Sequence, residues 1–254
     1  MLELRKIRKV YSGIAAVEEV SFTARAGEIT GYLGANGSGK STTMKMVTGL
    51  IDPSGGEVLF QGKLILDDLM GYRQRIGYVP EEPYLYTHLS GIEYLVMVGQ
   101  LRGMPGAMAS TKIKGLLHLF GLYGDRDVSI ASYSKGMRQK VLLSAALLHN
   151  PELVLLDEPF SGLDVGSSLV LRCLIEELSR RGKVVLFSSH ELETVERISH
   201  RIVILHKGRI VADDSIERLR ELMSLPTLEE IFSQLAVEVD AGAIAREIAE
   251  LIHA

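Results

Sequence analysis

The sequence predicts an α/β fold, because two kinds of strand pattern alternate with helical patterns along its 254 residues. One kind alternates apolar and polar residues and is typical of an antiparallel sheet with one exposed face. The other is a compact apolar run, typical of a parallel sheet that is buried on both faces. The alternating segments are residues 2–7, 17–24 and 57–62, and the compact ones are residues 28–33, 153–157 and 183–189.

The composition is 46% hydrophobic, which is enough for a sizeable core. With 28 Lys and Arg against 32 Asp and Glu, and no long basic run, a dedicated nucleic-acid-binding protein is disfavoured. No apolar run approaches the roughly 20 residues of a membrane-spanning helix, and the N-terminus has no signal-peptide pattern. The single cysteine, Cys173, excludes an internal disulfide and fits a reducing cytosol, and we interpret it as a core residue.

Helical spacing dominates between about residues 88 and 149, where apolar patterns are separated by glycines. This predicts a mostly helical insertion between the strands. Residues 201–213 then resemble a hairpin that turns at residues 207–208. Beyond the hairpin the pattern is helical and polar, and Thr227 and Glu230 have the spacing of a capping box that starts a last helical region.

The segment GANGSGKST, residues 34–42, follows a compact strand and precedes a helical pattern. It has the spacing G-x-x-x-x-G-K-S/T of a phosphate-binding loop, in which backbone N–H groups surround polyphosphate. Lys40 can reach the terminal phosphates and Ser41 can bind Mg²⁺. The alternative, an ordinary glycine-rich turn, leaves Lys40 and Ser41 at this spacing by chance. The candidate nucleotide-binding residues are Gly34, Asn36, Gly37, Ser38, Gly39, Lys40, Ser41 and Thr42.

Two further strand ends carry groups suited to phosphate chemistry. In LVLLDEP, Asp157 can bind Mg²⁺ and Glu158 can act as the general base for an attacking water. In LFSSHE, His190 can contact the terminal phosphate or orient the water. Taken singly, the acidic pair is also explained as a solvated turn and His190 as a loop or capping histidine.

These motifs, together with YSKGM at 133–137 and SGLD at 161–164, resemble the nucleotide-binding subunits of ABC transporters, in that family's order. The resemblance implies a P-loop NTPase, RecA-like core with an antiparallel β subdomain and an inserted helical subdomain. It implies an ABC ATPase domain over residues 1–213, with the helical subdomain at about 88–149, and a helical C-terminal extension over 214–254. It also implies that Tyr11 stacks on adenine, although the sequence alone favours an exposed tyrosine there.

The stretch SYSKGMRQK, residues 132–140, begins a helical pattern. In the family that it resembles, this helix start faces ATP held by another subunit in a head-to-tail dimer. Ser134 and Gly136 would therefore serve the partner's site, since a hydroxyl and a helix N-terminus both suit a phosphate and Gly136 leaves room for it. The alternative is a helix capped by Ser134 with a glycine turn.

The chain departs from the commonest family pattern at two places. Lys135 and Met137 stand where the signature often has Gly and Gln, and Glu81 stands where many members have the Q-loop glutamine. A carboxylate can still bind Mg²⁺ but offers no N–H donor. Both departures, and LEEIF at 228–232, resemble export-type members. By the same resemblance, residues 84–86 would contact a transmembrane partner, unless they only pack the helical subdomain.

The resemblance implies an ATPase that uses ATP and Mg²⁺, forms a homodimer, and drives a separate transmembrane permease subunit, with export favoured. Such a subunit would lie peripherally on the cytoplasmic face of the membrane and bind no nucleic acid. A soluble ABC-type ATPase and a non-transport P-loop interaction module remain as alternatives. A GTPase is disfavoured because the only asparagines, Asn36 and Asn150, do not form a guanine-binding N-K-x-D motif.

Overall fold

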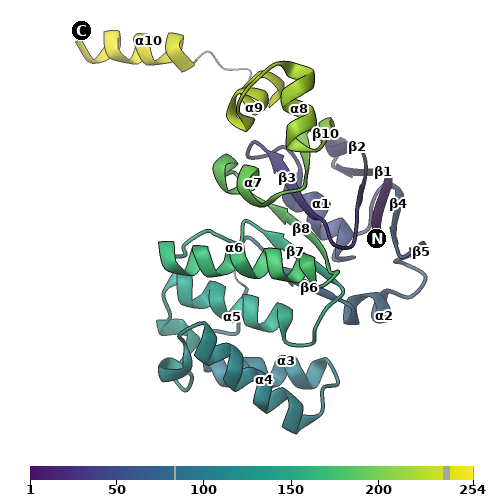
Figure 1. Ribbon diagram of the computed structural model, residues 1–254, viewed down its shortest axis with the longest axis vertical. Helices are drawn as coiled ribbons and strands as arrows, with labels where there is room; N and C mark the ends of the chain where they lie inside the picture. The colour runs from purple at the N-terminus through teal and green to yellow at the C-terminus, as the bar shows by residue number, and fades with distance from the viewer. Residues whose placement is uncertain (83, 237–240, 254) are drawn as a thin grey trace.

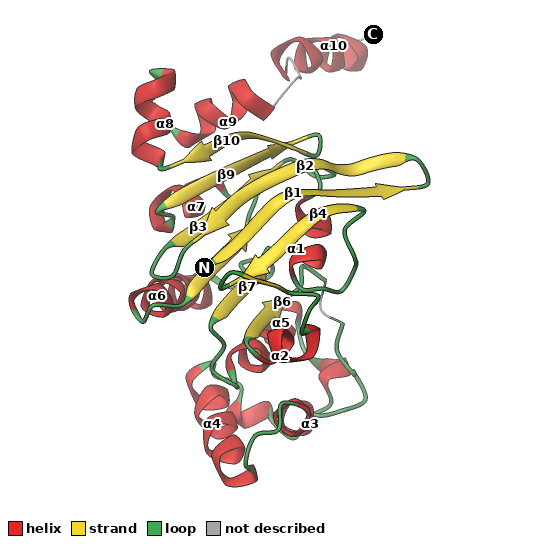
Figure 2. Ribbon diagram, turned by 90° about the vertical axis from the view of Figure 1, so that its right-hand side faces the viewer, coloured by secondary structure: helices red, strands yellow, loops and turns green. Residues whose placement is uncertain are grey.

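The computed structural model describes residues 1–82, 84–236 and 241–253. Within these residues, the strands form one mixed, curled sheet in the order β5-β4-β1-β2-β10-β9-β3-β8-β7-β6 (Figure 2). Its strands are β1 (Leu2–Tyr11), β2 (Ile14–Ala24), β3 (Ile29–Gly34), β4 (Gly55–Phe60), β5 (Lys63–Leu64), β6 (Ile76–Val79), β7 (Leu153–Asp157), β8 (Val184–Ser188), β9 (Arg201–His206) and β10 (Arg209–Asp214).

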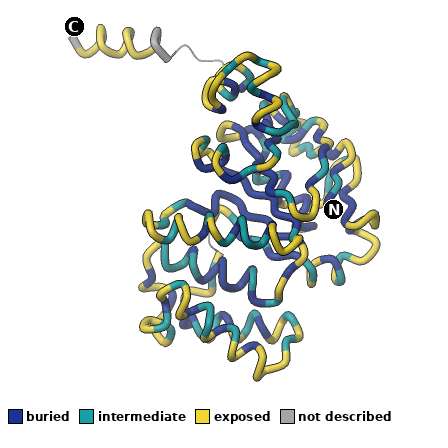
Figure 3. Tube along the Cα trace, viewed as in Figure 1, coloured by how far each residue is buried: buried dark blue, intermediate teal, exposed yellow. Residues whose placement is uncertain are grey.

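The two predicted kinds of strand occupy different parts of this sheet. The alternating segments form β1, β2 and β4, which pair antiparallel. The compact segments form β3, β7 and β8, which run parallel and are buried along their whole length (Figure 3). A single parallel pair, Arg209 with Glu19, joins the two parts. The carboxyl ends of β3, β7 and β8 therefore lie along one edge, where ligands of open α/β sheets bind.

The helices are α1 (Lys40–Val47), α2 (Leu69–Gln74), α3 (Gly91–Leu101), α4 (Gly106–Leu119), α5 (Lys135–Leu147), α6 (Val165–Arg180), α7 (Leu192–Ile198), α8 (Ile216–Met223), α9 (Leu228–Ala236) and α10 (Ala241–His253). Helices α3, α4 and α5 gather at one end of the molecule (Figure 1). They share a separate hydrophobic core around Leu95, Ile113 and Leu117. The predicted helical insertion is thus present, packed by its own apolar faces.

The hairpin and the tail also follow the sequence pattern. β9 and β10 pair antiparallel around residues 207–208. Thr227 and Glu230 form a reciprocal capping box, in which Glu230 N donates to Thr227 Oγ1 and Thr227 N donates to the Glu230 carboxylate, both at 3.2 Å. The helix α9 that they start packs against α7 and α8. Residues 237–240 and 254 of the predicted C-terminal extension lie outside the described residues.

The interpretation of Cys173 as a core residue is wrong. Cys173 is exposed, because the buried face of α6 is formed by Leu171, Ile175 and Ser179, at intervals of four residues. Cys173 lies two residues from Leu171, which places it on the opposite side of a helix with 3.6 residues per turn.

Helix α6, with 16 residues, is the longest helix among the described residues. Among the described residues, no helix is both long enough and apolar enough to cross a bilayer.

Candidate ATP-hydrolysis site

The loop between β3 and α1 requires glycine at several positions. Gly37 and Gly39 have φ of 78° and 107°, in the left-handed region that glycine adopts without strain. A Cβ on Gly39 would lie 2.5 Å from the main-chain oxygen of Ala16, and one on Gly34 would lie 2.6 Å from that of Leu205. The loop is therefore packed against neighbouring backbone in a shape that other residues would disturb.

This loop presents hydrogen-bond donors to a cavity of about 280 Å³. Lys40 is only 7% exposed, and its Nζ donates to the main-chain oxygens of Gly34 at 2.7 Å and Ala35 at 3.3 Å. The Ser38 hydroxyl is buried without a hydrogen-bond partner among the described residues. Helix α1 has no side-chain cap, so its N-terminal N–H groups are available to an anion. The cavity is lined by Ala16, Asn36, Gly37, Gly39, Lys40, Ser41, Thr42, Glu81 and Glu158.

Three oxygen-bearing side chains, Ser41, Glu81 and Asp157, lie near one another, and the first two line this cavity. The Ser41 hydroxyl donates to Glu81 Oε2 at 3.3 Å. Asp157 ends β7, and burial raises the pKa of its carboxyl, while the hydrogen bond from Ser188 and the nearby Ser41 hydroxyl act in the opposite direction. Among the described residues, no group of three or more His, Cys, Asp or Glu side chains could hold a metal alone. One hydroxyl and two carboxylates nevertheless suit Mg²⁺, which normally takes further oxygens from phosphates and water.

Glu158 lies directly after Asp157 and is 7% exposed. Its φ of 48° is in the left-handed region, which is uncommon for a residue other than glycine. Its Oε2 is 2.8 Å from Nδ1 of the His190 ring and also accepts a hydrogen bond from the main-chain N–H of His190 at 3.3 Å. The strand ends of β7 and β8 thus bring the carboxylate and the imidazole together.

The start of α5 carries the signature residues. Ser134 is its N-cap, and the Ser134 hydroxyl accepts the N–H of Met137 at 3.2 Å. A Cβ on Gly136 would lie 2.7 Å from the main-chain oxygen of Gly162. Lys135 donates to the Ser161 hydroxyl at 2.7 Å. Neither Ser134 nor Gly136 is among the described residues that line the cavity at the phosphate-binding loop of the same chain.

A sequence model described as ABC transporter matches residues 17–161. The chain belongs to the ABC transporter family. Among its relatives, the ABC-type transporter ATP-binding protein EcsA of Bacillus subtilis (strain 168) is 35% identical over 247 residues, covering 95% of this chain and 98% of that protein. The ABC transporter ATP-binding protein NatA of the same strain is 36% identical over 220 residues, covering 86% and 89%.

Solved structures agree with this assignment of the ABC chain. An ATP-binding subunit of an ABC transporter superposes with a TM-score of 0.87 at 34% identity, covering 92% of this chain and 99% of that one. A dimeric post-hydrolysis state of the ATP-binding cassette MJ0796, bound to ADP and Pi, gives 0.79 at 25% identity, covering 85% and 99%. The predicted P-loop NTPase fold is confirmed, and the chain is an ATP-hydrolysing, ATP-binding subunit of an ABC transporter.

Tyr11 of this ABC protein lies at the end of β1 and is 47% exposed. The Lys9 ammonium lies 5.4 Å from the centroid of its ring. Tyr11 is not among the described residues that line the cavity at the phosphate-binding loop. The structure therefore has the exposed tyrosine that the sequence alone favours, and stacking on adenine stays a prediction.

Two residues of this ABC protein that contact the site residues, Ser188 and Gly208, were not predicted from the sequence. Ser188 ends β8, and its hydroxyl contacts both Asp157 and the backbone of Glu158. Gly208, in the β9–β10 turn, donates its N–H to the main-chain oxygen of Ser38 at 3.0 Å. Both contacts join residues far apart in sequence, and a serine at the end of a buried strand or a glycine in a turn has no periodic pattern that indicates them.

The ionisation of Glu158 gives a testable pH effect. Burial raises the pKa of the Glu158 carboxyl, while His190 and the charge on Lys40 act in the opposite direction. Because only the ionised carboxylate accepts a proton, turnover should fall as the pH drops through this pKa. Replacing His190 with Ala removes contacts that lower the pKa, so the acid limb of the residual activity should move to higher pH.

The measurement for this prediction is kcat against pH at saturating ATP for wild type and His190→Ala. His118→Ala, in the last turn of α4, is the control and should keep the wild-type profile. An acid limb that stays in place in the His190 variant would show that this contact does not set the ionisation of Glu158.

Proposed function

We propose that this ABC ATPase holds two ATP molecules between two copies of the chain arranged head to tail, and that closure of the dimer moves a separate transmembrane subunit. The observation that carries the proposal is the position of Ser134 and Gly136. Both lie at a helix N-terminus outside the phosphate-binding cavity of their own chain. A second copy can bring such a helix end to the phosphates, and the dimeric form of the cassette MJ0796 supports this arrangement.

In this proposal each residue of the site has one task. The Lys40 ammonium, now bonded to the main-chain oxygens of Gly34 and Ala35, turns to the terminal phosphates. Ser41, Glu81 and Asp157 would hold Mg²⁺, which neutralises phosphate charge when it is bound. Glu158 takes a proton from the attacking water, and His190 fixes the Glu158 carboxylate through Nδ1.

We also propose the division of the chain that the sequence indicates. Residues 1–213 form the ATPase domain, with the helical subdomain at about 88–149, and residues 214–254 form an extension. Helices α3, α4 and α5 share a separate hydrophobic core, which supports a helical subdomain at about residues 88–149. The extension is attached through Glu196 of α7, whose carboxylate accepts bonds from Arg220 and from the N–H of Leu228.

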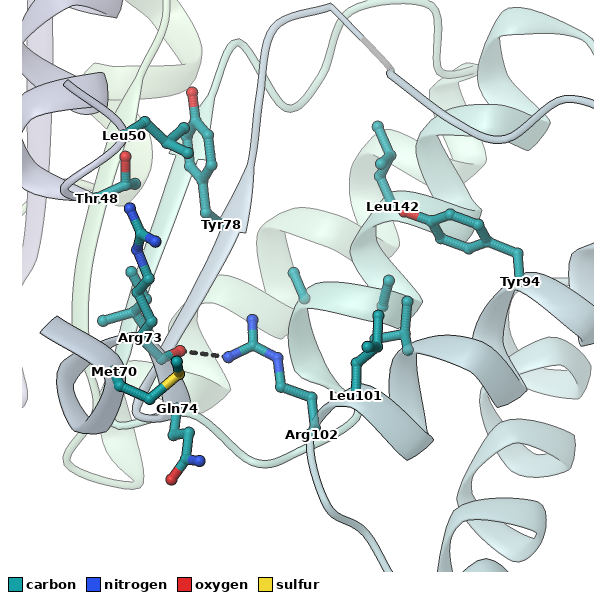
Figure 4. Close-up of a pocket in the computed structure, with 14 residues that line it drawn as sticks. Thr48, Leu50, Met70, Arg73, Gln74, Tyr78, Tyr94, Leu101, Arg102 and Leu142 are labelled. Carbon is teal, nitrogen blue, oxygen red and sulfur yellow. Dashed lines mark hydrogen bonds between the residues drawn. The ribbon is translucent and has the colours of Figure 1, made fainter.

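A groove of about 600 Å³ lies between the helical subdomain and the rest of the chain (Figure 4). Arg102 crosses it and donates to the main-chain oxygen of Arg73. The groove is lined in part by Leu50, Met70 and Leu101, which are 58%, 74% and 78% exposed, respectively. Such an exposed apolar patch is typical of a protein–protein contact, so we assign it to the transmembrane subunit.

In the predicted contact segment, residues 84–86, one residue packs inside the protein and two are exposed. Leu85 packs against the hydrophobic clusters of the core and of the helical subdomain. Tyr84 and Tyr86 are 80% and 59% exposed. These two tyrosines are therefore the part of the segment that we assign to the transmembrane subunit.

Membrane recruitment tests the role of the groove. Leu101→Asp places a charge in the apolar patch, so co-expression with the transmembrane subunit should leave the variant largely outside the membrane fraction. Leu119→Asp is the matched control, because Leu119 is 82% exposed on α4 and is not a groove residue. Equal recruitment of both variants, with unchanged thermal unfolding, would reject the groove as the docking surface.

Glu81 gives a second test within the site. If its main task is to bind Mg²⁺ beside Ser41, Glu81→Gln should keep turnover within about threefold, because an amide oxygen also binds the metal. Glu81→Ala should need several-fold more Mg²⁺ for half-maximal turnover. The measurement is a Mg²⁺ titration of ATP turnover, with Glu82→Ala as the adjacent control. An unchanged titration for Glu81→Ala would leave Glu81 without a metal role.

Export is the direction we favour, because the signature YSKGM and Glu81 resemble export-type ABC ATPases. In this proposal the chain is a peripheral subunit held at the cytoplasmic face by its permease. Transport of a labelled cargo by inside-out vesicles that contain both subunits would test the direction: ATP-dependent uptake into such vesicles corresponds to export.

A further inference from the structure

We propose that Ser188 is a positioning residue that sets both carboxylates of the site at once. The inference rests on the proposed roles of Asp157 and Glu158 and adds a residue to which the sequence motifs give no task. Ser188 is the last residue of β8 and is 0% exposed. In the parallel pairing of β7 and β8 it lies directly opposite Asp157.

One hydroxyl makes two bonds of opposite direction. Ser188 Oγ donates to Asp157 Oδ1 at 2.5 Å and accepts the main-chain N–H of Glu158 at 3.0 Å. A serine hydroxyl has one donor and two acceptor positions, so a single side chain can satisfy both neighbours. An alanine would leave the buried Glu158 N–H without this acceptor and Asp157 without this donor.

Both bonds act where geometry matters for the reaction. The Glu158 N–H is held at a residue whose φ is 48°, so the bond to Ser188 helps to fix the turn that aims the carboxylate at the cavity. The bond to Asp157 Oδ1 fixes the rotation of that carboxylate and leaves its second oxygen for ligands. Ser188 therefore acts through Asp157 and Glu158 and needs no contact with ATP.

Ser188→Ala should retain ATP binding without Mg²⁺ and lose roughly 10- to 100-fold in kcat, the range expected for a lost buried hydrogen bond at a positioned group. The Mg²⁺ concentration that gives half-maximal ATP binding should rise several-fold. Ser188→Thr, which restores the hydroxyl, should recover most of both properties. If alanine prevents folding, Ser188→Cys replaces it, because cysteine has a similar size and only a weak S–H donor. The losses expected of Ser188→Ala are then expected of Ser188→Cys.

A matched control separates positioning from stability. Ser144 is also 0% exposed, but its hydroxyl donates to the main-chain oxygen of Lys140 within α5. Ser144→Ala also removes a buried hydroxyl and should keep both kcat and the Mg²⁺ dependence. If both alanine variants lose kcat in proportion to their loss of thermal stability, the positioning role of Ser188 is wrong.

A double variant tests whether Ser188 acts through Glu158. In single-turnover measurements, adding Ser188→Ala to Glu158→Gln should cost less than it does in the wild type, because the group that it positions is already disabled. The full loss in the double variant would mean that Ser188 does not act through Glu158, and it would overturn the inference that Ser188 sets both carboxylates. Normal turnover by Glu158→Gln would refute the proposed role of Glu158 as the base, on which the inference rests, whereas an inactive Glu158→Gln beside a fully active Ser188→Ala would refute only the inference.

Discussion

Replacing Glu158 with Gln is expected to lower ATP turnover by roughly 10²- to 10⁴-fold and to leave ATP binding intact, because the change removes a general base. The amide has the size of the carboxylate and keeps an oxygen that can accept a bond from His190, but it does not take a proton at neutral pH. The phosphate-binding loop and Lys40 are untouched. The loss should therefore appear in kcat and not in nucleotide affinity.

The same substitution should trap the closed dimer, because ATP that is bound but not hydrolysed holds the two copies together. The measurements are phosphate release, nucleotide binding and the concentration dependence of size in solution with ATP. Glu176→Gln is the matched control, since Glu176 makes only a 3.8 Å surface ion pair with Arg180. Turnover near the wild-type rate in Glu158→Gln would exclude Glu158 as the base.

The fold and the motif positions were largely predictable because they depend on local patterns. Alternating and compact strands separated the two parts of the sheet, and the capping box of Thr227 and Glu230 formed as its spacing indicates. The phosphate-binding loop was predictable for the same reason, since Gly39 and Lys40 act through backbone shape and reach within one short segment. The four-residue spacing of the buried positions of α6 is also present in the sequence, and this spacing places Cys173 on the exposed side of the helix.

Contacts between segments far apart in the sequence could not be predicted from local sequence patterns. Ser188 meets Asp157 across 31 residues only because β7 and β8 are neighbours in register. Gly136 faces Gly162, and Lys135 bonds Ser161, only because α5 packs on the loop that follows Glu158. Glycine at position 136 thus has a reason within its own chain, besides any role toward a partner's ATP.

The contact between Gly136 and the Gly162 backbone decides which variants can test the proposed dimer. A side chain at position 136 would collide with the Gly162 backbone, close to Glu158 of the same chain, and would damage two sites at once. Ser134→Asp avoids this, because Asp is a good N-cap and can still accept the Met137 N–H. Its negative charge would face the partner's phosphates. Ser134→Asn caps the helix without the charge and is the matched control.

The second large effect is expected from Lys40→Ala and Ser134→Asp, each of which should nearly abolish turnover as a homodimer. Lys40→Ala removes the charge that meets the terminal phosphates, and Ser134→Asp repels the ATP of the partner. Ser134→Asn should keep a substantial part of the activity. Thermal unfolding of all three variants checks that the losses arise at the site.

Mixing these two inactive variants tests the central claim, that each ATP site is built from two copies of the chain. In a mixed dimer both lesions fall on one site, and the other site combines an intact Lys40 with an intact Ser134. Random exchange of subunits should therefore restore about a quarter of wild-type turnover, because half of the dimers are mixed and each has one working site. Mixed dimers that form, as shown by differently tagged copies, yet neither hydrolyse nor trap ATP, would contradict a site shared between subunits.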